Sequence, residues 1–70
     1  MLKYRRKNLG ISQKYLAEKI GITQGYMSKL ENLKCKNINI SIISTISDEL
    51  ILDPVDVFLF FYTSYKNKQR

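Results

Sequence analysis

The stretch ITQGYMSKLEN, residues 22–32, combines hydrogen-bonding side chains with apolar residues at helical spacing. Met27 and Leu30 lie three positions apart and therefore share one face of a helix. The hydrogen-bonding residues fall on the other faces and comprise Gln24, Ser28 and Lys29. An amide can bond an adenine edge, an ammonium group can reach guanine O6 and N7, and a hydroxyl can donate or accept. Gly25 has no side chain, so it allows a close approach without contacting a base through one.

Two helices joined by a short turn would position these side chains. Ser12 is a typical N-cap, and the apolar residues after it recur at helical spacing, namely Tyr15, Leu16, Ala17 and Ile20. Gly21 ends this helix, expected over 13–20, and Thr23 can cap a second helix that runs from Gln24 to about Leu33. The pattern predicts a helix-turn-helix.

The remaining segments predict an all-α fold of five helices. One helix precedes the turn residues Asn8-Leu9-Gly10, and Asn39 can cap another. The apolar stripe of the latter is Ile40, Ile43, Ile46 and Leu50. Asp53-Pro54 is a strong start signal for a fifth helix over about 54–65. We expect one domain over 1–65 and a frayed, basic tail over 66–70.

Charge is unevenly distributed along the chain. The net charge is +6, and residues 1–36 carry nine Lys or Arg against two Glu, for +7. Residues 37–70 carry three basic against four acidic side chains, for −1. The first half therefore suits a polyanion such as nucleic acid, although a basic face kept for solubility would give the same totals.

Several classes of protein are not favoured by the composition. The chain has no histidine, and one cysteine, Cys35, is too few for a zinc site or an internal disulfide. Paired carboxylates in a cleft and a phosphate-binding glycine loop are also missing from the pattern, so neither an enzyme nor a cofactor is expected. No apolar run is long enough to span a membrane, and the first residues lack the apolar part of a signal peptide, so cytoplasm is the expected compartment.

The whole stretch LGISQKYLAEKIGITQGYMSKLEN resembles the Cro and phage-repressor family of helix-turn-helix proteins, also called Xre-like. The matching motifs are Ser12-Gln13, Leu16-Ala17-Glu18, Gly21-Ile22-Thr23 and Met27-Ser28-Lys29-Leu30-Glu31. The likeness extends over roughly residues 2–58. It implies a DNA-binding regulator of transcription, a repressor of bacterial, phage or mobile-element origin, that binds double-stranded DNA.

The resemblance also implies roles for individual residues. The second motif helix would lie in the major groove, with Gln24, Gly25, Ser28 and Lys29 at the bases. Gln13 resembles the family's phosphate clamp. The other expected contacts to the DNA backbone are Thr23, Tyr26, Asn32, Lys34 and Lys36. Arg6 and Glu31 match positions that often pair in the family, and we expect a structural ion pair, worth little if it lies at the surface.

Three positions depart from the family pattern. Leu33 stands where relatives have a glycine that ends the helix, so we expect Asn32 to adopt the left-handed conformation instead. Ile38 replaces the usual proline before the fourth helix, and Ile51 replaces the glycine that ends it. These changes affect the loop over 33–39 rather than the motif.

The fifth helix is more apolar than one buried face requires. At 100° per residue, one face comprises Pro54, Phe58, Phe61 and Tyr65, flanked by Val57 and Tyr62, and we expect it to pack on the core. Val55, Leu59 and Phe60 then remain outside, where they predict a homodimer contact. Deeper packing of the helix into the chain's own core would also account for these residues. The alternative function is a protein-interaction module, an antitoxin or adaptor, that binds a regulatory protein partner through this helix.

Overall fold

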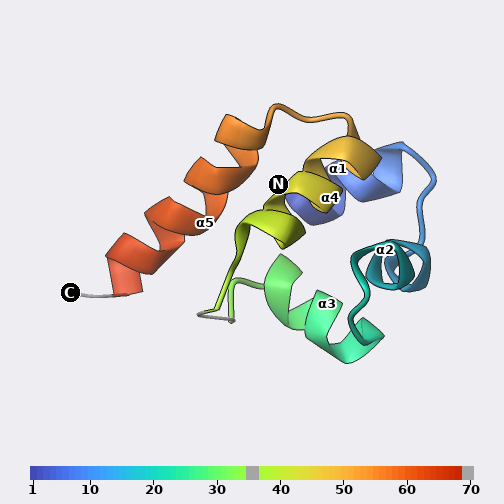
Figure 1. The fold of residues 1–70 in the computed structure, drawn as a ribbon, viewed down its shortest axis with the longest axis horizontal. Coiled ribbons are helices and arrows are strands. Elements are labelled where there is room, and N and C mark those ends of the chain that lie inside the picture. The colour runs from blue at the N-terminus through green and yellow to red at the C-terminus, as the bar shows by residue number, and fades with distance from the viewer. Residues whose placement is uncertain (35–36, 69–70) are drawn as a thin grey trace.

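The computed structural model describes residues 1–34 and 37–68 of the chain. Within those residues the regular secondary structure consists of five α-helices, with no strand. The helices are α1 (Leu2–Asn8), α2 (Gln13–Ile20), α3 (Gln24–Glu31), α4 (Ile40–Leu50) and α5 (Pro54–Lys68). This architecture confirms the expected all-α fold. In Figure 1, α2 and α3 lie at one end of the molecule, α5 lies at the other, and α4 packs between α2 and α5.

Side-chain caps begin four of the helices, and at α5 the Asp53 carboxylate accepts from the Val55 N–H at 2.8 Å. The side chains of Ser12, Thr23 and Asn39 each accept a hydrogen bond from the backbone N–H three residues later, at 2.9, 3.0 and 2.8 Å. Each bond satisfies an N–H group that has no partner within the helix. The predicted starts of α2, α3 and α4 are therefore confirmed.

Left-handed residues end the first four helices. Gly10 and Gly21 take this conformation with φ of 71° and 87°, as glycine does readily. Leu33 and Ile51 take it with φ of 59° and 54°, although a side chain disfavours it. The expectation for Asn32 is wrong, because its φ is −94° and the next residue makes the turn. Helix α3 consequently ends at Glu31 and not near residue 33.

The hydrophobic core lies around α4. Its buried side chains are Leu2, Leu16, Ala17, Met27, Leu30, Ile42, Ile43, Ile46, Leu50, Val57 and Phe61. In α2 and α4, two residues expected on buried faces are exposed instead, Tyr15 by 42% and Ile40 by 77%. In α4 the buried face is rotated toward Ile42, and it includes Ser47, whose hydroxyl donates to the Ile43 carbonyl at 2.6 Å. A serine whose hydroxyl donates to a backbone carbonyl of its own helix can lie on a buried face. A pattern of apolar residues alone does not predict such a buried serine.

Helix α5 packs on the core through a different face from the one expected. Val57 is fully buried and Phe61 nearly so, whereas Phe58 and Tyr65 are about half exposed. Val57 and Phe61 therefore form the side of α5 that packs on the core, and Phe58 and Tyr65 remain at its edge. The helix also continues to Lys68, beyond the expected end near residue 65.

Arg5 stabilises the end of α4. Its Nε donates to the Leu50 carbonyl at 2.9 Å, and its Nη2 donates to the Ile51 carbonyl at 3.2 Å. These carbonyls belong to a helix end, where the last C=O groups have no partner within the helix and carry partial negative charge. The guanidinium thus helps to hold Ile51 in a conformation that a β-branched residue rarely adopts.

Replacing Ile51 by glycine should therefore stabilise the protein. Glycine adopts φ near 54° without steric cost, and Ile51 is 71% exposed, so the change sacrifices little burial. We expect the free energy of unfolding, measured by urea denaturation, to rise by about 0.5–1 kcal/mol. Leu33→Gly is the matched control and should destabilise, because Leu33 packs against the core. A loss of stability in Ile51→Gly would contradict this account.

Candidate nucleic-acid interface

Helices α2 and α3 cross closely at a tight corner. Ala17 is 2% exposed and belongs to the core on which both helices pack. Gly21, in the left-handed conformation, turns the chain. The backbone N–H of Ile22 donates a hydrogen bond to the Ala17 carbonyl at 3.0 Å. Ile22 also packs against the core. The corner thus fixes the direction in which α3 leaves α2.

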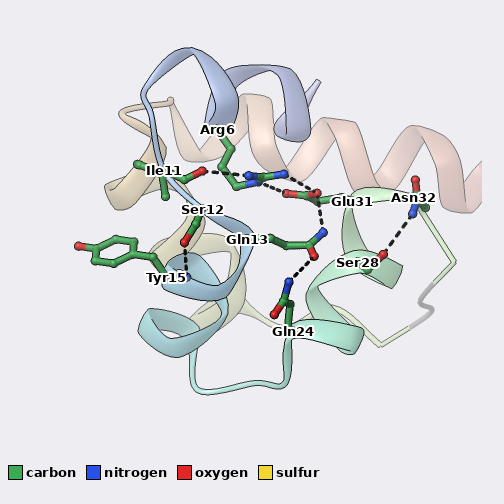
Figure 2. A network of polar contacts seen from close by, with 9 residues as sticks. All are labelled: Arg6, Ile11, Ser12, Gln13, Tyr15, Gln24, Ser28, Glu31 and Asn32. Carbon is green, nitrogen blue, oxygen red and sulfur yellow. Dashed lines mark hydrogen bonds and ion pairs between the residues drawn. The ribbon is translucent and has the colours of Figure 1, made fainter.

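A buried ion pair links α1 to the last turn of α3. Figure 2 shows the Arg6 guanidinium facing the Glu31 carboxylate, with Nε donating to Oε2 at 2.6 Å and Nη2 donating to Oε1 at 3.3 Å. Arg6 Nη1 donates to the Ile11 carbonyl at 2.9 Å. The side chains are only 8% and 1% exposed, so the expected pair is present but is not a surface pair. A bidentate pair with its other groups satisfied holds α3 in a fixed orientation.

Two glutamines extend this network to the beginning of α3. Gln13 Nε2 donates to Glu31 Oε1 at 3.1 Å, and Gln13 Oε1 accepts a hydrogen bond from Gln24 Nε2 at 3.3 Å. Both glutamines occupy the first position of their helices. Figure 2 shows the chain of contacts running from Arg6 through Glu31 and Gln13 to Gln24. The Gln24 side chain is therefore oriented before any ligand binds.

The predicted base-contacting residues lie on the outside of α3. Gln24, Gly25 and Lys29 are exposed and Ser28 is half-buried, while the apolar face of the helix is in the core. The structure therefore brings the four residues to one accessible stretch of a helix. This exposure is what a base contact requires, and the contact itself remains a prediction.

Gly25 has no structural reason to be a glycine. Its φ is not positive, and a Cβ added to it would meet no atom within 4 Å. Glycine within a helix costs about 0.5–1 kcal/mol relative to alanine. Gly25 thus destabilises α3 without relieving any steric contact. A glycine at this position is consistent with a flat helix surface that a ligand can approach closely.

The predicted backbone-contacting residues differ in their surroundings. Thr23 is exposed and caps α3, and Asn32 donates to the Ser28 hydroxyl at 3.5 Å. The Tyr26 hydroxyl donates to the Asn37 carbonyl at 3.2 Å, so a phosphate would have to compete with that bond. Lys34 is exposed. Lys36, also predicted to contact the DNA backbone, and the neighbouring Cys35 lie outside the described residues.

The basic half of the chain exposes many of its charges. The exposed lysines among residues 1–34 are Lys3, Lys7, Lys14, Lys19, Lys29 and Lys34. Arg6 is neutralised by Glu31 and does not contribute, which the sum of charges did not reveal. Lys19 lies over the Tyr15 ring with its Nζ 5.4 Å from the centroid, an arrangement that favours a cation. Helices α2 and α3 with the residue Lys34 thus expose four lysines against one acid, Glu18, and carry a net positive charge at the surface.

Comparison with protein families identifies the class of this domain. A family model described as helix-turn-helix matches residues 2–57. Because the match covers most of the chain, the chain belongs to this helix-turn-helix family, which is of the Cro and phage-repressor, Xre-like type. It is accordingly a DNA-binding regulator of transcription. Comparisons with curated proteins and with solved structures give no match.

The structure also bears on membrane association. None of the helices formed by residues 1–34 and 37–68 has the length and apolar character needed to cross a bilayer.

Removal of one partner of the Arg6–Glu31 pair should be strongly destabilising, because the other charge stays buried. Glu31→Leu leaves the Arg6 guanidinium buried without its partner, and we expect a loss of about 3–5 kcal/mol in the free energy of unfolding. The double variant Arg6→Met/Glu31→Leu should recover most of this loss, because no charge remains buried. Urea denaturation of the two variants checks both values. A loss below about 1 kcal/mol in Glu31→Leu would mean that the pair behaves as a solvated one.

Proposed function

We propose that this protein is a transcriptional repressor that recognises a specific double-stranded DNA site with the N-terminal half of α3. The observation that carries the proposal is the position of Gln24, which is exposed and yet held by Gln13. A side chain fixed in this way loses little conformational freedom on binding, which favours affinity.

The chemistry of α3 suits base edges in the major groove. An α-helix is about 10–12 Å in diameter, and the major groove is about 12 Å wide, so α3 can enter it. The Gln24 amide has a second N–H and its carbonyl oxygen beyond the bond to Gln13, and these are the groups that an adenine edge pairs with. Lys29 suits guanine O6 or N7, and Ser28 suits either type of edge.

The remaining contacts would attach the domain to phosphates. Helix α2 would cross the DNA backbone, with the N–H groups of its first turn and Gln13 near a phosphate. Thr23, Tyr26, Asn32, Lys34 and Lys36 are the other residues that we assign to the backbone. Such contacts set the register of the protein on DNA but do not distinguish sequences.

The proposed regulator would act as a homodimer without enzymatic activity. One recognition helix contacts only a few base pairs, and a two-fold dimer contacts two half-sites about 34 Å apart. A repressor of this kind would work in the cytoplasm of a bacterium, on chromosomal, phage or mobile-element DNA.

Lys29 should contribute to sequence recognition. Selection from a random DNA pool is expected to yield a two-fold symmetric consensus. On that site, Lys29→Ala should weaken binding by about 1–3 kcal/mol per subunit and relax the preference at one base pair of each half-site. Fluorescence anisotropy over a range of salt concentrations measures both the affinity and its salt dependence.

Lys66→Ala is the matched control, because it removes the same charge from α5, outside the two motif helices α2 and α3. It should leave the base preference unchanged. Equal effects of the two substitutions would show that only net charge matters, and the absence of any enriched sequence would contradict specific recognition.

A further inference from the structure

The loop that joins α3 to α4 is attached to α3 at both of its described ends. At the first end, the backbone N–H of Lys34 donates to the Lys29 carbonyl at 2.9 Å. At the other end, the Tyr26 hydroxyl donates to the Asn37 carbonyl at 3.2 Å. Lys29 and Tyr26 both belong to α3, so the two ends of the loop are oriented relative to that helix.

The same loop ends also pack on the core. Leu33 and Ile38 are partly buried against it, and so is the ring of Tyr26. Leu33 is in the left-handed conformation, and the bond from the Lys34 N–H then closes the end of α3 as a Schellman motif does. The residues next to these anchors, Lys34 and Asn37, are exposed. The loop therefore presents two polar side chains from backbone positions that the protein itself fixes.

The Tyr26 hydroxyl can donate to one acceptor at a time. A phenol has one hydrogen, and that of Tyr26 is donated to the Asn37 carbonyl. A phosphodiester accepts hydrogen bonds and has no hydrogen to donate, so the lone pairs that remain on the phenolic oxygen cannot bind it. In this arrangement Tyr26 holds the loop and does not itself contact a phosphate.

Lys34 and Asn37 are chemically suited to phosphates. Lysine ammonium groups and asparagine amides are among the groups that bind the DNA backbone in protein–DNA complexes. Lys34 has a long side chain, which can reach a phosphate from many conformations. Asn37 has a short one, so the position of its amide depends on the position of its backbone. That backbone is the part of the loop to which the Tyr26 hydroxyl is bonded.

We propose that Asn37 is a further contact to the DNA backbone and that Tyr26 is the residue that positions it. The bond from Tyr26 fixes the Asn37 carbonyl, which is attached to the same Cα as the amide side chain. This part of the loop is then ordered before DNA binds, and binding loses less conformational freedom. The ligand, double-stranded DNA, rests on the proposed function. Among the residues assigned to the DNA backbone, Tyr26 accordingly acts through the loop.

A double-mutant cycle on the full chain tests this role. Tyr26→Phe keeps the ring and removes the hydroxyl, and Asn37→Ala removes the amide. Each substitution should weaken binding to the selected duplex by about 2- to 10-fold, which is the range for the loss of one hydrogen bond. The double variant should bind nearly as well as the weaker single variant, because Asn37 is already displaced when the hydroxyl is absent. The base preference should stay the same, since backbone contacts do not distinguish sequences.

Tyr4→Phe is the matched control, because it makes the same chemical change on α1, where Tyr4 is 73% exposed. It should leave the affinity for DNA unchanged. In the free protein, the carbonyl-carbon NMR signal of Asn37 should shift in Tyr26→Phe and not in Tyr4→Phe, because only the former loses the bond to that carbonyl. Circular dichroism establishes that each variant is folded.

The outcomes separate this inference from the proposed function. Additive losses in the double variant would overturn the positioning role, because the two residues would then act on DNA independently. Wild-type affinity in Asn37→Ala, or an unchanged Asn37 carbonyl signal in Tyr26→Phe, would also overturn the inference. Selection of a specific DNA site by the wild-type protein would leave the proposed function intact in each of these cases. A wild-type protein that selects no DNA sequence would contradict the proposed function and, with it, the contact made by Asn37.

Discussion

The buried ion pair between Arg6 and Glu31 is the interaction on which the arrangement of α3 depends. An eight-residue helix is too short to be stable by itself, so tertiary contacts must hold it. The apolar face of α3 is buried in the core, which stabilises the helix. The bidentate pair fixes the orientation of α3, because a guanidinium and a carboxylate form two parallel hydrogen bonds only when they lie in one plane. Through Gln13 the same network reaches Gln24, so the orientation of an exposed side chain is set by a contact made inside the protein.

The fold separates two kinds of surface. Helices α2 and α3 expose hydrogen-bonding and basic side chains, whereas α5 exposes apolar ones, among them Val55, Phe58 and Leu59. A domain of 70 residues buries a limited fraction of its surface, and a helix apolar on two sides cannot bury both of them in so small a core. The homodimer proposed above would cover part of the apolar surface of α5 and leave α3 accessible.

Local signals predicted the fold and much of the candidate site. Capping side chains act within one turn of a helix, so Ser12, Thr23 and Asn39 could be identified from sequence. Burial depends on how helices pack, which periodicity does not determine, so the buried faces of α4 and α5 were predicted only in part. Ile43, Ile46, Leu50 and Phe61 are buried as expected. Ile40, Phe58 and Tyr65 are exposed instead. The link between Gln13 and Gln24 depends on the crossing of two helices. Its one local signal was a glutamine directly after each N-cap.

The central claim is that α3, with its leading end held by the Arg6–Glu31 network, is the surface that binds DNA. The most direct test follows the backbone amide signals by NMR while a duplex that carries the selected site is added. The account predicts that the largest changes fall on residues 24–29 and the first turn of α2, while residues 55–65 are little affected. Changes concentrated on residues 55–65, with the signals of 24–29 unaltered, would contradict it.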